Sequence, residues 1–117
     1  MPQADRRYGA AAHTAAARRA ARAAGLLRQV QERREFRDRA ASAAEAGAGA
    51  PQATDEERRR LRALSHTAQQ ALDTAVMMAL ADRTPPPDHE IAAAAGVDAY
   101  GLEHVRQRLS GPGRTGR

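Results

Sequence analysis

Apolar residues recur at helical spacing in the middle of the chain. In steps of three or four they form one stripe, which lies on a single face of an α-helix. The stripe consists of Leu61, Leu64, Ala68, Leu72, Val76 and Leu80. Thr54 and Glu57 have the spacing of a capping box, which starts a helix, and the three prolines from Pro85 onward end one. The pattern predicts an amphipathic helix over Asp55–Arg83.

Two shorter helices are predicted after the prolines, joined at Gly96. Ile91 and Ala95 are four residues apart and share one face of the first helix. Gly96 is expected to end that helix in a left-handed conformation, which costs glycine little. Asp98 is placed to cap the second helix. The inner stripe of the second helix is Leu102, Val105 and Leu109.

The large apolar residues are few, because alanine supplies most of the hydrophobic fraction. The expected core consists of Leu61, Leu64, Leu72, Val76, Leu80, Ile91, Val97, Leu102, Val105 and Leu109. A core of this size is marginal for an isolated domain, so a partner surface is expected.

The first part of the chain predicts a different kind of helix. It is dominated by alanine and arginine, both strong helix formers, so helix is predicted over Ala10–Ala46. Gly25 is expected to divide or bend this stretch. This arm, residues 1–50, has no full apolar stripe. It is therefore expected either to dock against the rest of the chain or to stay mobile until it meets a partner. The residues for docking are Leu27, Val30 and Phe36. The run GAGAPQ over residues 47–52 predicts a linker.

Three short segments carry a resemblance to a known group of proteins. They are EIAAAAGV (90–97), LEHV (102–105) and the closing pair Arg108–Leu109, about a fifth of the chain. They resemble, at superfamily level, the tri-helical and winged helix-turn-helix domains of bacterial transcription regulators. The resemblance implies an all-α fold in which the helix over residues 55–83 supports the helix-turn-helix pair. It also implies that the second helix of the pair lies in the DNA major groove.

The resemblance places six positions toward the bases. They are Asp98, Ala99, Tyr100, Glu103, His104 and Gln107. Tyr100 suits a thymine methyl, Gln107 an adenine and Glu103 the amino group of a cytosine. The chain departs from the usual pattern at Gly101, which costs about 1 kcal/mol inside a helix. It also departs in placing two acids and no arginine among the six. A wing is not expected, since only eight residues follow Leu109.

The excess of positive over negative charge is confined to the first part of the chain. Residues 1–50 hold ten arginines against five acids, which accounts for the whole formal charge of +5, and the rest is balanced. Arginine binds phosphate through its forked guanidinium, without reading base sequence. The candidates for phosphate contact are Arg18, Arg19, Arg22, His89, Arg106 and Arg108.

The remaining composition argues against several other classes of protein. There is no cysteine, so a disulfide framework and a cysteine-based zinc site are excluded. The four histidines have no metal-binding spacing, and neither a phosphate loop nor a catalytic pair is visible. We therefore expect no enzyme, no cofactor and no metal. No secretory signal or membrane span is recognised, so a cytoplasmic bacterial protein is expected.

The sequence thus predicts a small all-α DNA-binding protein, a transcriptional or plasmid/phage regulator that reads the major groove through residues 98–109. A basic helical arm over 1–50, a tri-helical domain over 51–110 and a flexible tail over 111–117 are expected. Double-stranded DNA is the expected partner, with dimerisation to lengthen the site that is read. Two alternatives stay open: a helical accessory protein that docks another protein through the same face, and non-specific nucleic-acid binding by the arm alone. An ordinary helical hairpin would also give the motif's pattern.

Overall fold

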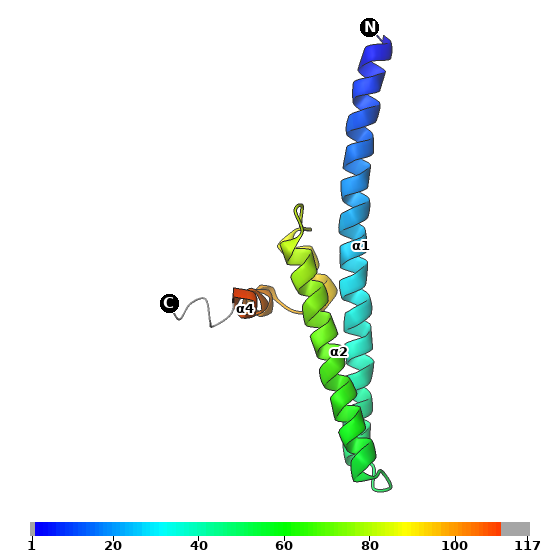
Figure 1. Ribbon diagram of the computed structural model, residues 1–117, viewed down its shortest axis with the longest axis vertical. Helices are drawn as coiled ribbons and strands as arrows, with labels where there is room; N and C mark the ends of the chain where they lie inside the picture. The colour runs from blue at the N-terminus through cyan, green and yellow to red at the C-terminus, as the bar shows by residue number, and fades with distance from the viewer. Residues whose placement is uncertain (1, 111–117) are drawn as a thin grey trace.

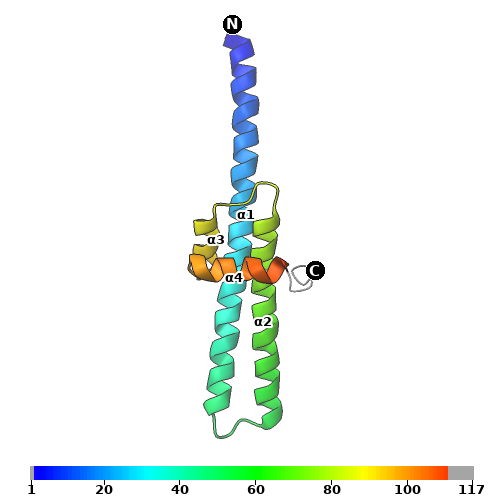
Figure 2. The same cartoon turned by 90° about the vertical axis from the view of Figure 1, so that its left-hand side faces the viewer.

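The computed structural model describes the backbone of residues 2–110 and the side chains of residues 14–108. Within these limits it consists of α1 (Pro2–Gly49), α2 (Asp55–Ala81), α3 (Asp88–Ala95) and α4 (Ala99–Ser110), and it holds no strand. The predicted all-α fold class is confirmed. α1 and α2 form a long antiparallel hairpin, and α1 extends well beyond the end of α2 (Figure 1). α3 lies beside the hairpin and α4 runs across it (Figure 2). The predicted tail over 111–117 lies outside the described residues.

α1 is a single straight helix, so the expected division or bend at Gly25 is wrong. A side chain added at Gly25 would meet nothing within 4 Å, which shows that no packing demand acts on this position. Alanines and arginines on both sides of Gly25 favour the helix enough to offset one glycine. The helix also runs three residues into the predicted linker, which is thereby shortened to the turn that follows Gly49.

α2 begins as predicted and ends two residues earlier than predicted. The hydroxyl of Thr54 accepts a hydrogen bond from the backbone N–H of Glu57 at 3.1 Å. In return, the Glu57 carboxylate accepts one from the backbone N–H of Thr54 at 3.4 Å. The capping box is therefore complete. At the other end, the extended backbone of Asp82 ends the helix before the prolines are reached.

The corner between α3 and α4 also forms as predicted. Gly96 is left-handed, with φ 73° and ψ 30°. The Asp98 carboxylate caps α4 by accepting a hydrogen bond from the backbone N–H of Gly101 at 2.8 Å. A Cβ at Gly101 would lie 3.0 Å from the Cβ of Val97, so the glycine that departs from the usual pattern allows a close approach. A Cβ at Gly96 would lie 2.5 Å from Nε of Arg34 in α1, so the corner itself packs against the long helix.

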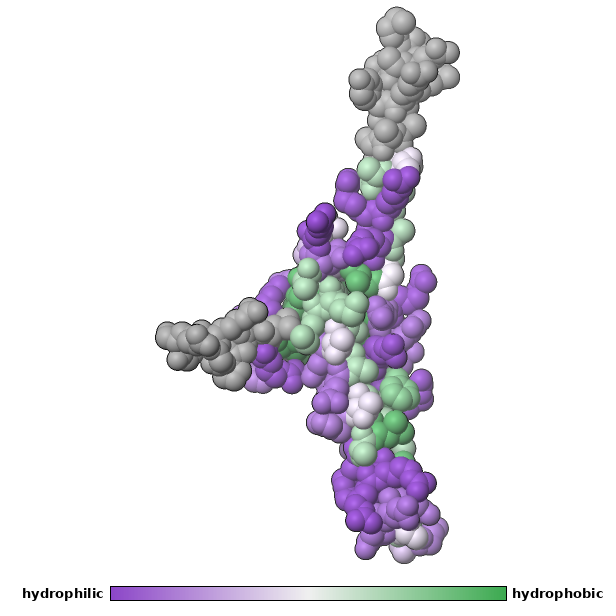
Figure 3. Space-filling model, in the orientation of Figure 1, coloured by the Kyte–Doolittle hydropathy of each residue, from purple (hydrophilic) through white to green (hydrophobic). Residues whose placement is uncertain are grey.

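All four helices contribute to one hydrophobic core. Its members are Val30, Leu72, Ala75, Val76, Ala79, Ile91, Ala92, Ala95, Leu102 and Val105. Val30 of α1 is fully buried, and Leu26 and Leu27 pack against the same core. Residues 26–30 of the expected arm therefore share a core with the three later helices. Figure 3 shows apolar surface over the middle of the hairpin and polar surface around its turn.

Several residues of the expected core are less buried than predicted. Leu64 is 44% exposed, whereas Leu61, Leu80 and Val97 are half-buried. For Leu61 and Leu64 the physical reason is the position of α3 and α4, which cover only the half of the hairpin away from its turn (Figure 2). Near the turn the two long helices pack only against each other, through small residues such as Ala40 and Ala68. The side chain of Leu109 lies outside the described residues.

Candidate nucleic-acid interface

The outer face of α4 is open to solvent. All six positions predicted to face the bases are exposed, from Asp98 to Gln107. Tyr100 is 87% exposed, so it does not pack against α2. On the opposite face of the same helix, Leu102 and Val105 are buried in the core. α4 is therefore held by its apolar side and presents its polar side outward.

Four of these residues line a shallow hollow of about 270 Å³ on the outer face. They are Tyr100, Glu103, His104 and Gln107. In the described part of the chain, only Glu103 among them has a polar partner, Arg106, at 3.5 Å. The phenol, the imidazole and the amide thus keep their donors and acceptors available. These groups can hydrogen-bond base edges or phosphates, and the Tyr100 ring can cover an apolar group.

Asp98, which was predicted to contact a base, already has a hydrogen-bond partner within the molecule. Its carboxylate is bound to the first turn of α4, which makes it a structural cap. Ala99, beside it, is exposed and offers only a methyl group. The base-reading chemistry of the predicted set is therefore concentrated in the four residues of the hollow.

Three of the six candidates for phosphate contact are held in ion pairs within the molecule. Arg22 pairs with Asp82. Arg106 pairs with Asp88 at 2.6 Å and with Glu103. Arg108 pairs with Asp73 at 3.3 Å. Most of these acids are far from their arginines in sequence, which is why sequence reasoning missed them. Arg18, Arg19 and His89 are exposed, and the structure shows no ion pair for them among the described side chains.

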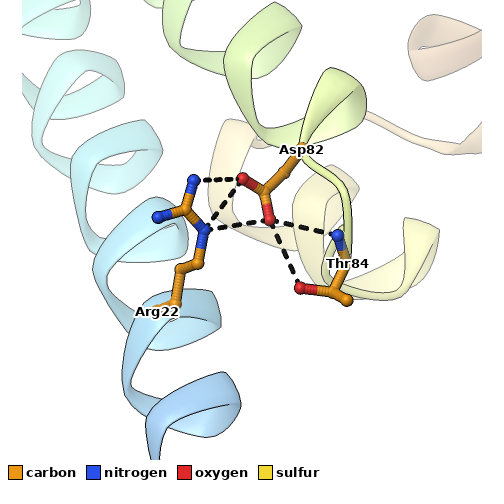
Figure 4. Close-up of polar contacts among 3 residues, drawn as sticks. All are labelled: Arg22, Asp82 and Thr84. Carbon is orange, nitrogen blue, oxygen red and sulfur yellow. Dashed lines mark hydrogen bonds and ion pairs between the residues drawn. The ribbon is translucent and has the colours of Figure 1, made fainter.

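The pair formed by Arg22 and Asp82 ties α1 to the end of α2 (Figure 4). Nε and Nη2 of Arg22 donate to Oδ1 of Asp82 at 2.9 and 2.5 Å. The backbone N–H of Thr84 donates to the other carboxylate oxygen at 3.3 Å. The hydrogen bond from Arg22 is the largest cause that lowers the pKa of Asp82 below its ordinary value. The Asp82 side chain is only 5% exposed, so the contact is a fixed clasp between the two helices.

A second polar contact joins α3 to α4. Arg106 of α4 donates to Asp88 of α3, and this hydrogen bond is the largest cause that lowers the pKa of Asp88. The pair borders a hollow of about 430 Å³ between the two helices. Its floor is apolar and includes Ala92, Val97 and Leu102, while its rim is charged. Sequence reasoning missed this hollow, because the rim combines residues from both helices.

The charges of α3 and α4 are mainly negative. Four acids face two arginines over residues 88–108, and both arginines are already paired. The acids are Asp88, Glu90, Asp98 and Glu103. The arm differs, because residues 14–31 hold four arginines and no acid. Positive and negative surfaces are therefore separated within the molecule.

Other kinds of site find no support in the part of the chain that the structure describes. No group of three or more histidine and acidic side chains is placed to hold a metal ion there. None of the described helices combines the length and the apolar character that a membrane crossing requires. Comparison of the chain with protein-family models, curated proteins and solved structures gives no match.

Proposed function

We propose that this chain is a small DNA-binding protein, a transcriptional or plasmid/phage regulator, in which α4 enters the major groove. One observation carries the proposal. The left-handed corner at Gly96 holds α4 by its apolar side and leaves its polar side open along its whole described length. A recognition helix needs this arrangement, because its outer side chains must reach base edges. The protein then acts by occupying its site, without catalysis.

The proposed contacts divide into those that read bases and those that bind the backbone. Tyr100, His104 and Gln107 read bases from the outer hollow, and Glu103 accepts a hydrogen bond from a cytosine amino group. Arg18 and Arg19 contribute phosphate attraction from the arm, since they have no ion pair among the described side chains. Because this attraction releases counterions from DNA, the affinity must fall steeply with salt. A dimer doubles the number of bases read.

Duplex binding by matched glutamine variants tests the proposal. Gln107→Ala removes an amide from the outer hollow, and Gln70→Ala removes one from an exposed position of α2. After selection of a preferred duplex, we expect Gln107→Ala to weaken binding by about 5- to 100-fold, the range for one bidentate base contact. Gln70→Ala should leave the affinity unchanged. Undetectable duplex binding at low ionic strength, or equal loss in both variants, contradicts the proposal.

A second candidate function is favoured by the charge of α3 and α4. An accessory protein that binds another protein would use the same scaffold, and its docking face can be acidic. The carboxylates on the rim of the hollow between α3 and α4 suit a basic partner better than they suit phosphate. In that case, replacing Tyr100 and His104 abolishes binding of the protein partner and leaves any DNA binding by the arm unchanged.

A further inference from the structure

The hollow between α3 and α4 has the chemistry of a site for a cationic helix. Its floor is built from small apolar side chains, including Ala92 and Ala93. Asp88 and Glu103 stand on its rim, and Arg106, which bonds to both, compensates only one of the two charges. Nothing in the described part of the chain fills this space. A helix that carries alanines and arginines on one side could pack its alanines against the apolar floor and pair its arginines with the carboxylates of the rim.

The molecule itself carries such a helix. Over residues 14–25, α1 consists of alanine, three arginines, one threonine and one glycine. Most of these residues are exposed, and this segment extends beyond α2 (Figure 1). Arg18 and Arg19 have no ion pair among the described side chains. Small side chains let a helix approach a neighbouring surface closely, and the two arginines can then reach carboxylates at its edge.

The segment cannot reach the hollow of its own molecule. α1 is continuous through Gly25 and straight, and its N-terminal end points away from α3 and α4 (Figures 1 and 2). The clasp between Arg22 and Asp82 fixes its direction at the end of α2. An occupant from the same sequence must therefore come from a second copy.

We propose that residues 14–25 of one molecule dock in the hollow between α3 and α4 of a second copy, with Arg18 and Arg19 beside Asp88 and Glu103. Each copy has one such segment and one hollow. The contact is therefore reciprocal in a two-fold dimer, or head-to-tail in a ring or an open chain. This association competes with DNA, because Arg18, Arg19 and Glu103 cannot contact DNA while they pair across two copies. It goes beyond the proposed DNA binding and is measured without DNA, so its failure leaves the proposed recognition role untouched.

Sedimentation velocity of the full chain tests the proposal over a range of concentrations, at low and at high salt. We expect self-association that weakens as salt rises, because the attraction is between exposed charges. The double variant Arg18→Glu, Arg19→Glu should weaken it by about ten-fold or more, since attraction is replaced by repulsion. The matched control, Arg59→Glu with Arg62→Glu, makes the same charge change on exposed positions of α2 and should weaken it far less.

A charge exchange completes the test. The double variant Asp88→Arg, Glu103→Arg reverses the two carboxylates on the rim and should also lose self-association. Mixing it with the variant of Arg18 and Arg19 should restore association between the two chains. Circular dichroism of each variant confirms that the helices are retained. A wild-type chain that stays monomeric at every concentration, an equal effect of the α2 control, or no recovery on mixing overturns the proposal.

Discussion

The two parts of α1 have similar composition and very different surroundings. Residues 26–49 lie against α2 and α3 and bury Val30 completely, whereas residues 14–25 extend into solvent. Both parts are rich in alanine and arginine. The difference lies in Leu26, Leu27 and Val30, three aliphatic side chains for which residues 14–25 have no equivalent. A few large apolar residues thus decide which part of an alanine-rich helix joins a core, because alanine alone buries little area.

The boundary between the two parts coincides with the clasp formed by Arg22 and Asp82. The arginine side chain is 65% exposed, so the pair contributes little free energy of its own. Its fork geometry instead fixes the direction in which the exposed segment leaves the body. Residues 26–49 of α1 are therefore held by packing, whereas in residues 14–25 Arg22 is paired with α2 and Arg18 and Arg19 are exposed.

The largest effect is expected from removing buried aliphatic groups. Ile91→Ala should lower the free energy of unfolding by about 2–5 kcal/mol. Val30→Ala should lower it by about 1.5–2 kcal/mol, because two fully buried methyl groups are lost from the core. Leu64→Ala, at a position that is 44% exposed, is the control and should cost less than Ile91→Ala. Urea unfolding followed by circular dichroism measures all three. An unchanged stability in Val30→Ala would place α1 outside the core.

Replacing either of two glycines by alanine should change the free energy of unfolding, in opposite directions for the two positions. Gly96→Ala should destabilise by about 1–2 kcal/mol, because alanine is strained in the left-handed conformation and its Cβ would displace Arg34. Gly25→Ala should stabilise by about 0.5–1 kcal/mol, because it lies in open helix with nothing within 4 Å. Thermal unfolding of the two variants measures the difference. A stabilising Gly96→Ala would contradict the corner geometry.

Acid should weaken the ion pair between Arg22 and Asp82, which joins α1 to the end of α2. Arg22 holds the pKa of Asp82 below its ordinary value, so the folded state binds the Asp82 proton more weakly than the unfolded state. The stabilisation is therefore present above the unfolded pKa of about 3.9 and is lost as pH falls through the lower folded pKa.

Unfolding curves recorded near neutral pH and in acid measure this loss. Asp82→Asn should reduce the loss of stability in acid, and Glu45→Gln, at an exposed position, is the matched control. If Asp82→Asn and the wild type lose the same stability in acid, the clasp has no thermodynamic role.

The smallest effect on stability is expected in the exposed segment itself. Arg18→Ala and Arg19→Ala should each change the free energy of unfolding by less than about 0.5 kcal/mol, because both side chains are exposed. Each should nevertheless reduce the salt dependence of DNA binding by about one phosphate contact. Affinities measured at several salt concentrations give this slope. An unchanged slope would remove these arginines from the proposed interface.

The local structure of the chain was predictable where one residue type has one strong physical role. The capping box at Thr54, the left-handed Gly96 and the cap at Asp98 are confirmed, because each depends on neighbours a few residues away. The tertiary contacts were not predictable. Docking through Leu27, Val30 and Phe36 was only one of two alternatives; Leu27 and Val30 do pack in the core, whereas Phe36 is 37% exposed. No sequence spacing shows that Asp82 meets Arg22 sixty residues earlier.

In the candidate site, too, one part could be predicted from the sequence and another part could not. The exposure of the outer face of α4 follows from the apolar stripe on its other side, so sequence periodicity was enough to predict it. The pairing of Arg106 and Arg108 with acids of other helices depends on how those helices pack. The hollow between α3 and α4 depends on the same packing, and only the folded chain reveals it.

An NMR titration tests whether the outer face of α4 contacts DNA. Duplex DNA is added to the isotope-labelled full chain, and the shift of each backbone amide is followed. We expect the largest shifts over residues 98–108, with Tyr100, His104 and Gln107 among them, and smaller shifts near Arg18 and Arg19. Shifts confined to the arm, or none at low ionic strength, would contradict this contact.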